Sequence, residues 1–250
     1  MAKNTNSSGA AKDCEDKLAQ LVDGKYSVLE NFFNGQKLKL KEQKFAEFEE
    51  EVKKARAAFA SGRGTGASAQ RAERELSAME AEFVKWYEGN DDMDDAPLFS
   101  AVVSFFREAK EKLAVYRSAM ECLSAGSKEG CMEMLARAFA KYKSAAQAAC
   151  SIAKGGDERM ADNADTIMRY IDLDHEGFLV DMMAPSGSGE NPADRAISRA
   201  SGRHASLMDM RSQAYHAQNA ALQKAANELL AASYEYQGAL CAAYLFAEQG

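Results

Sequence analysis

Hydrophobic residues recur every three to four positions along most of the chain, which is the spacing of one face of an α-helix. One regular stripe consists of Ala69, Ala72, Leu76, Met79, Phe83 and Trp86. Another consists of Cys131, Leu135, Ala138, Tyr142, Ala145, Ala149 and Ile152. About a fifth of the residues are alanine, which has the highest intrinsic helix propensity. The pattern therefore predicts helix throughout.

Glycine and serine interrupt this pattern and divide the chain into four long segments. The interruptions lie at 61–68, 125–127 and 184–192. The segments between them are roughly 11–60, 67–125, 127–183 and 192–248. Within the segments we expect helices to end at Gly35, at Gly89, at Gly155–Gly156 and at Gly177.

Proline and aspartate indicate where helices begin. The only prolines are Pro97, Pro185 and Pro192, and each stands at the edge of a helical pattern. Asp95 followed by Pro97 is typical of a capped helix start, and Asp157 is a second candidate cap. No proline follows Pro192, so we expect one long helix from there to the end of the chain. Gly202 and Gly238 weaken this helix without having to break it.

The apolar stripes are wider than the seam of a two-stranded coiled coil. Phe32 stands beside Phe33, and Phe105 stands beside Phe106. This width favours an all-α fold, an elongated antiparallel bundle of about 6–7 helices with a long C-terminal helix. The expected organisation is a disordered tail (1–10), a helical bundle (11–183), a Gly/Ser/Pro linker (184–191) and the long C-terminal helix (192–250).

Composition and charge limit the classes of partner. Hydrophobic residues make up 46% of the chain and the net charge is −7. An interspersed, acidic charge pattern makes nucleic acid an unlikely partner, because phosphate binding needs a concentrated basic face. No apolar run approaches the ~20 residues that span a bilayer. A membrane surface is not favoured, since the basic stretch 37–44 adjoins acidic residues.

The first residues and the cysteines favour the cytoplasm. No apolar signal region is visible at the N-terminus. The cysteines are five in number, widely spaced and without a Cys-x-x-Cys pair, which is typical of buried thiols in a reducing compartment. The polar first nine residues leave an alternative, export without a cleavable signal.

One local motif carries a specific chemistry. Residues 172–179 read Asp-Leu-Asp-His-Glu-Gly-Phe-Leu, which matches the first half of an EF-hand calcium loop. The second half differs, because valine and methionine stand at the ninth and twelfth positions. Two interpretations remain. Either residues 172–183 form a degenerate metal loop that uses Asp172, Asp174 and Glu176, or they form a capped loop between helices, which we favour.

The sequence offers little evidence for catalysis. The histidines, His175, His204 and His216, have no spacing that places two of them on one helical turn. No nucleophile–base pair or phosphate-binding loop is evident, so we expect no enzyme activity and no cofactor. His204 falls on an apolar stripe and is expected to be packed. A catalytic role for any histidine would need a partner that sequence spacing does not identify.

These observations favour a non-enzymatic helical interaction or scaffold protein that acts through protein–protein contacts or self-association. Three alternatives remain: a membrane-associating helical protein, a secreted bacterial effector or translocator, and a calcium-responsive helical protein. The surroundings of the last helix separate two situations. An exposed apolar stripe on it would require a partner, whereas burial on both faces would direct attention to pockets.

Overall fold

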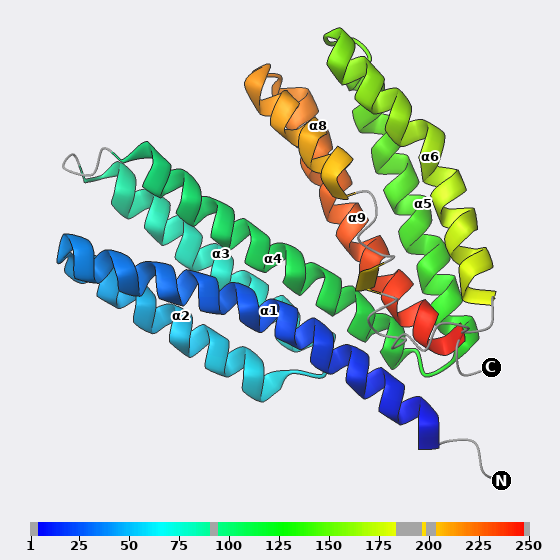
Figure 1. Ribbon diagram of the computed structural model, residues 1–250, viewed down its shortest axis with the longest axis horizontal. Coiled ribbons are helices and arrows are strands. Elements are labelled where there is room, and N and C mark those ends of the chain that lie inside the picture. The colour runs from blue at the N-terminus through cyan, green and yellow to red at the C-terminus, as the bar shows by residue number, and fades with distance from the viewer. Residues whose placement is uncertain (1–4, 91–94, 184–196, 199–203, 248–250) are drawn as a thin grey trace. The chain divides into compact units, whose positions relative to one another are not determined.

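In a computed structural model, the described residues, 5–90, 95–183, 197–198 and 204–247, form eight α-helices and no strand. The helices are α1 (Thr5–Leu40), α2 (Gln43–Gly62), α3 (Gly66–Glu88), α4 (Ala96–Ser124), α5 (Lys128–Ala153), α6 (Glu158–Met183), α8 (His204–His216) and α9 (Ala220–Ala247) (Figure 1). The all-α helical bundle expected from the sequence is confirmed, with slightly more helices than expected. Within the described ranges, no helix is both long and apolar enough to cross a membrane.

Side-chain caps define several helix starts, as the sequence predicted. The Asp95 carboxylate accepts a hydrogen bond from the Leu98 amide (3.0 Å), with Pro97 in the first turn of α4. Asp157 accepts one from the Met160 amide at the start of α6 (2.9 Å). These short polar side chains satisfy amide groups that have no partner within the helix.

Two helix ends and one helix start differ from the positions expected from the sequence. Helix α1 continues through Gly35 to Leu40, and α6 continues through Gly177 to Met183. Helix α1 already begins at Thr5, so the tail expected at 1–10 is wrong from that residue on. Beyond Gly177 the buried stripe of α6 resumes at Met182. Beyond Gly35 the last apolar residues of α1, Leu38 and Leu40, are exposed, and Lys37 pairs instead with the buried Glu49 of α2. These contacts outweigh the weak helix propensity of one glycine.

The last segment holds two helices instead of one in its described part. Helix α8 ends at His216 and α9 begins at Ala220, so the single helix expected from 192 onward is wrong. Gln218 adopts a left-handed backbone (φ 52°), which no helix can continue. The side-chain oxygen of Asn219 then accepts a hydrogen bond from the Leu222 amide (3.0 Å) and so caps α9. Gly238 lies inside α9, whereas Pro185, Pro192, Gly202 and the predicted linker 184–191 lie outside the described residues.

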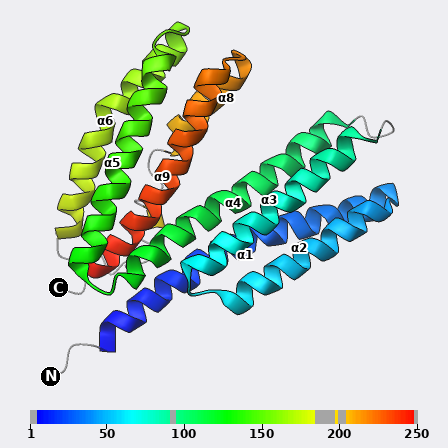
Figure 2. The same ribbon diagram turned by 180° about the vertical axis from the view of Figure 1, so that it is seen from behind.

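The chain forms two compact units. Residues Glu15–Arg117 make up one, which we call the aromatic unit; Met1–Cys14 with Ser118–Gly250 make up the other, which we call the C-terminal unit. Helices α2 and α3 belong entirely to the aromatic unit, and α5, α6, α8 and α9 belong to the C-terminal unit. In the aromatic unit, α2 and α3 contact each other, and the view in Figure 2 shows them running side by side.

Phenylalanine fills the core of the aromatic unit. The ring of Phe33 on α1 lies 5.3 Å from Phe48 on α2, 6.1 Å from Phe83 on α3 and 6.2 Å from Phe106 on α4, measured between centroids. Phe32, beside it, contacts Phe105 at 5.4 Å. The paired aromatics thus widen the apolar faces of α1 and α4, and Phe33 of α1 contacts three other helices, which is the arrangement of a bundle.

Helix α9 is the core helix of the C-terminal unit. Every residue from Ala239 to Leu245 is buried, so this part of α9 has no solvent-facing side. Helices α5, α6 and α8 all contact α9. A helix that is apolar on all sides belongs in a core. The described part of the last segment therefore leaves no exposed apolar stripe on α9, which directs attention to pockets.

Candidate functional site

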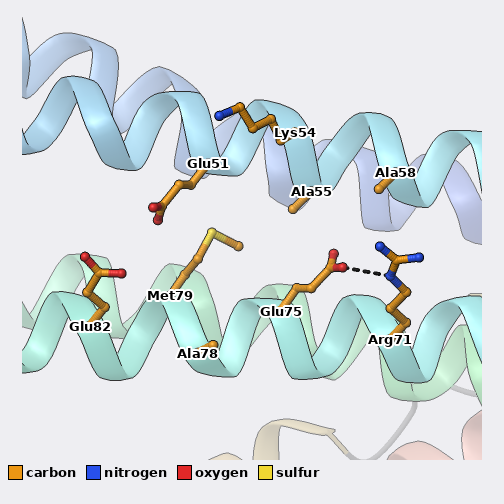
Figure 3. A pocket seen from close by; sticks show the side chains of 9 residues that line it. All are labelled: Glu51, Lys54, Ala55, Ala58, Arg71, Glu75, Ala78, Met79 and Glu82. Carbon is orange, nitrogen blue, oxygen red and sulfur yellow. Dashed lines mark hydrogen bonds and ion pairs between the residues drawn. The ribbon is translucent and has the colours of Figure 1, made fainter.

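A groove lies on the aromatic unit between α2 and α3 (Figure 3). Its volume is about 420 Å³. The lining residues are Glu51, Lys54, Ala55, Ala58, Arg71, Glu75, Ala78, Met79 and Glu82. Alanine and methionine supply an apolar floor, and charged side chains surround it. Such a mixture of apolar surface and a few polar groups is typical of binding sites.

The groove follows from how α2 and α3 pack. Their buried stripes face inward and are formed by Phe45, Phe48, Val52, Ala55 and Phe59 on α2 and by Ala69, Ala72, Leu76, Met79 and Phe83 on α3. Outside this seam, Ala58 on α2 and Ala78 on α3 are too small to fill the space between the two helices. The hollow therefore lies where small residues border the packed stripes.

Most charged groups around the groove are already paired. Arg71 donates from Nε to Glu75 (2.9 Å), which is the interaction dashed in Figure 3. Lys44, just outside the lining, donates to Glu82 (2.5 Å) and to Glu47 (3.0 Å). These pairs neutralise each other locally and are partly open to water, so each contributes little to stability.

Glu51 differs from these carboxylates. Its Oε2 atom is covered from solvent and has no hydrogen-bond donor in the part of the chain that the structure describes. In Figure 3 its carboxylate points from α2 toward Met79 and Glu82 of α3. Burial, and then the negative charge of Glu82, raise the pKa of Glu51 above its usual range. The site thus holds a partly buried carboxylate with one covered oxygen that lacks a donor, which costs free energy in the isolated chain.

The neighbours of Glu51 along α2 show that this is not a general property of the acidic run. Glu50 is exposed and accepts a hydrogen bond from Lys53 (2.9 Å). Glu49 is buried but is paired with Lys37 of α1 and with Lys53 (2.7 Å). Those two lysines lower the pKa of Glu49 despite its burial. Of the three consecutive glutamates, Glu51 is the one that faces the groove.

The predicted calcium residues lie elsewhere and do not form a loop. Asp172, Asp174 and Glu176 all lie within α6, which is helical through Met183. The loop expected at 172–183 is therefore wrong, because the apolar positions of this segment continue the buried stripe of α6 to Met182. Both carboxylate oxygens of Asp172 accept hydrogen bonds from Lys143 of α5 (2.7 Å).

No other acidic cluster in the described ranges gathers metal ligands. Among those residues, no group of three or more His, Cys, Asp or Glu side chains is placed to hold a metal ion. Calcium binding by Asp172, Asp174 and Glu176 stays a prediction without support from this geometry. Asp91, Asp92 and Asp94, which precede Asp95 in the sequence, lie outside the described residues.

The structure identifies partners for His175 that sequence spacing could not reveal. Its Nδ1 lies 3.0 Å from the hydroxyl oxygen of Tyr236 on α9, and its ring stacks on Phe139 of α5. Tyr142 of α5 stacks on Tyr236 from another side (5.4 Å). We call Phe139, Tyr142, His175 and Tyr236 the aromatic clamp, because they join α5, α6 and α9. Burial lowers the pKa of His175.

The other predicted sites have structural roles. His204 is partly buried, with its ring 5.6 Å from that of Tyr234, in agreement with the packed position expected for it. The interruption expected at 61–68 contains a short turn between α2 and α3, in which the Gly64 amide donates a hydrogen bond to the Tyr116 hydroxyl (2.7 Å). The groove has no signature in the sequence, because its residues are spread over α2 and α3 and no local motif connects them.

Comparison with known proteins returned no relative. No family model, no curated protein and no solved structure matches the chain.

Proposed function

We propose that this chain is a non-enzymatic α-helical interaction or scaffold protein, and that the groove between α2 and α3 is one of its docking surfaces. The observation that carries the proposal is the groove's lining: an apolar floor of Ala55, Ala58, Ala78 and Met79 surrounded by charged side chains. Alanine and methionine provide packing surface, and methionine adapts its shape to different partners. A surface of this kind binds through burial of apolar area, with charges at its border that select the partner.

The helical framework supports the same proposal. Helices α2 and α3 are held from behind by the phenylalanine core, in which Phe48 and Phe83 lie 5.6 Å apart. A rigid support keeps a docking surface in its binding shape and reduces the entropy lost on association. The net charge of −7 adds long-range attraction for partners of opposite charge.

Site-specific photo-crosslinking tests this proposal in cells that express the full chain. A photoreactive phenylalanine analogue replaces either Ala58, which lines the groove, or its neighbour Ala57, which is exposed outside it. We expect a discrete crosslinked protein from position 58 and little or none from position 57. Equal crosslinking from the two positions, or none from either, would contradict a docking role for the groove.

A further inference from the structure

Resting on the docking role proposed above, we propose that the groove receives a helix of a partner protein whose contact face carries one lysine or arginine, and that this cation pairs with Glu51. The proposal combines the shape of the groove, the chemistry of its floor and the state of one carboxylate. Each of these restricts the partner in a different way.

The shape favours a helix as the bound element. The groove runs between two neighbouring helices, and a third helix packed there would extend the bundle by the same side-chain interdigitation. Small residues on the floor, Ala55, Ala58 and Ala78, allow the axis of an incoming helix to approach closely. The thioether of Met79 rises between the two helices and can fill gaps beside it (Figure 3).

The state of Glu51 favours a cation on that helix. Glu82 already accepts a hydrogen bond from Lys44, and Glu75 accepts one from Arg71. The Oε2 atom of Glu51 has no such donor within the described residues. Docking of an apolar helix would remove further water from this carboxylate and increase the free energy lost by burying its charge. An ammonium or guanidinium group on the helix would instead supply the donor that Oε2 lacks.

A peptide library provides a probe that does not require the natural partner. Helix-forming peptides with a randomised apolar face are displayed and selected on the immobilised full chain. Selected peptides are then synthesised with a fluorescent label, and their affinities are measured by anisotropy. We expect one position of the selected face to be enriched in lysine or arginine.

Matched variants then test the pairing. Glu51→Gln removes the negative charge of Glu51 from the groove, and Glu50→Gln removes the exposed charge beside it. We expect Glu51→Gln to weaken binding by roughly 10- to 100-fold, the range of a hydrogen bond to a charged group, and Glu50→Gln to leave it nearly unchanged. Replacing the peptide's arginine by neutral citrulline should weaken binding to the wild type but hardly change binding to Glu51→Gln. Circular dichroism spectra of both variants serve as the control for correct folding.

The outcomes separate this proposal from the docking role itself. Ala58→Glu, which obstructs the groove, and Ala57→Glu, outside it, provide the distinction. Suppose that Ala58→Glu abolishes peptide binding and Ala57→Glu does not. If the selected peptides then lack a basic residue, or if Glu51→Gln binds them as well as the wild type, the groove is a docking surface and the cation proposal is wrong. If no peptide is selected, or if Ala58→Glu and Ala57→Glu bind the peptides equally well, the docking role and the cation proposal are both wrong.

Discussion

The imidazole of His175 on α6 lies flat on the phenyl ring of Phe139 on α5, with ring centroids 3.7 Å apart and an interplanar angle of 11°. Its Nδ1 also lies within hydrogen-bond distance of the hydroxyl oxygen of Tyr236 on α9. Three helices of the C-terminal unit are therefore joined at a histidine, the residue type whose ordinary pKa lies closest to neutral pH. The protonation state of that side chain affects how well the three helices stay together.

The aromatic clamp predicts a loss of stability on acidification. Burial lowers the pKa of His175, and the carboxylates of Asp172 and Glu176 only partly oppose this effect. The unfolded chain then binds the proton more tightly than the folded chain, so stability falls as the pH drops below about 6.5, the unfolded value, toward the lower folded value. We expect the melting temperature of His175→Gln to fall less than that of the wild type between pH 7.5 and 5.5. Equal decreases in thermal scans of the two proteins would contradict this role.

The second prediction concerns Arg56, which joins α2 to α1. Its Nε and Nη2 atoms donate to the two carboxylate oxygens of Asp23 (2.6 and 2.7 Å), and Nη1 donates to Glu30 (3.0 Å). The Arg56 hydrogen bond lowers the pKa of Asp23. Lysine keeps the charge but cannot form the two-pronged contact, so Arg56→Lys should lower the free energy of unfolding by about 1 kcal/mol. Urea titrations measure this difference. Arg74→Lys, on an exposed position of α3, should have no comparable effect.

The third prediction concerns the turn between α2 and α3. Gly64 has φ +98°, and its amide donates to the Tyr116 hydroxyl, which in turn lies 3.3 Å from a carboxylate oxygen of Glu15. Tyr116→Phe removes the acceptor, so we expect a loss of about 1 kcal/mol and faster hydrogen exchange at the Gly64 amide. Tyr215→Phe, in an exposed position, serves as the control. Unchanged exchange at Gly64 would show that this hydrogen bond does not hold the turn.

The fourth prediction uses the two non-glycine residues that adopt left-handed conformations in the described part of the chain. Lys41 ends α1 with φ 56°, and Gln218 separates α8 from α9 with φ 52°. Glycine adopts such angles without the strain of a side chain, so Lys41→Gly and Gln218→Gly should each raise stability by up to about 1 kcal/mol. Ala217→Gly is the control and should lower stability or leave it unchanged. A loss of stability in Gln218→Gly would show that the side chain compensates for the strain.

These positions also explain which parts of the fold are predictable from sequence. The starts at Asp95 and Asp157 are evident because the cap and the amide it binds are three residues apart. The ends at Lys41 and Gln218 are not, since neither residue is a usual one for a left-handed backbone. Glycine at 35 and at 177 indicates helix ends that more distant contacts suppress, namely the pairing of Lys37 with Glu49 in α1 and the burial of Met182 in α6.

The candidate site was less predictable, for a related reason. Acidic residues at 172, 174 and 176 have a local spacing that suggests a loop, but the helical stripe through Ile171 and Met182 determines the conformation. Glu51 belongs to a run of three glutamates that look equivalent in sequence. Glu49 has a donor because Lys37, 12 residues away, reaches it. Glu51 lies instead near Glu82 of another helix, whose negative charge raises the pKa of Glu51. Contacts of this range have no signature in a single sequence.

The burial of α9 has a consequence for the order in which the chain folds during synthesis. All residues from Glu15 to Arg117 are synthesised before α5, so the aromatic unit can acquire its phenylalanine core before the C-terminal unit is complete. Helices α5, α6 and α8 are made before α9, the helix on which they pack. These three helices can pack partly on one another, but the apolar surface that they bury against α9 stays uncovered until Ala239–Leu245 emerge. In that interval the nascent chain is exposed to aggregation and to chaperones.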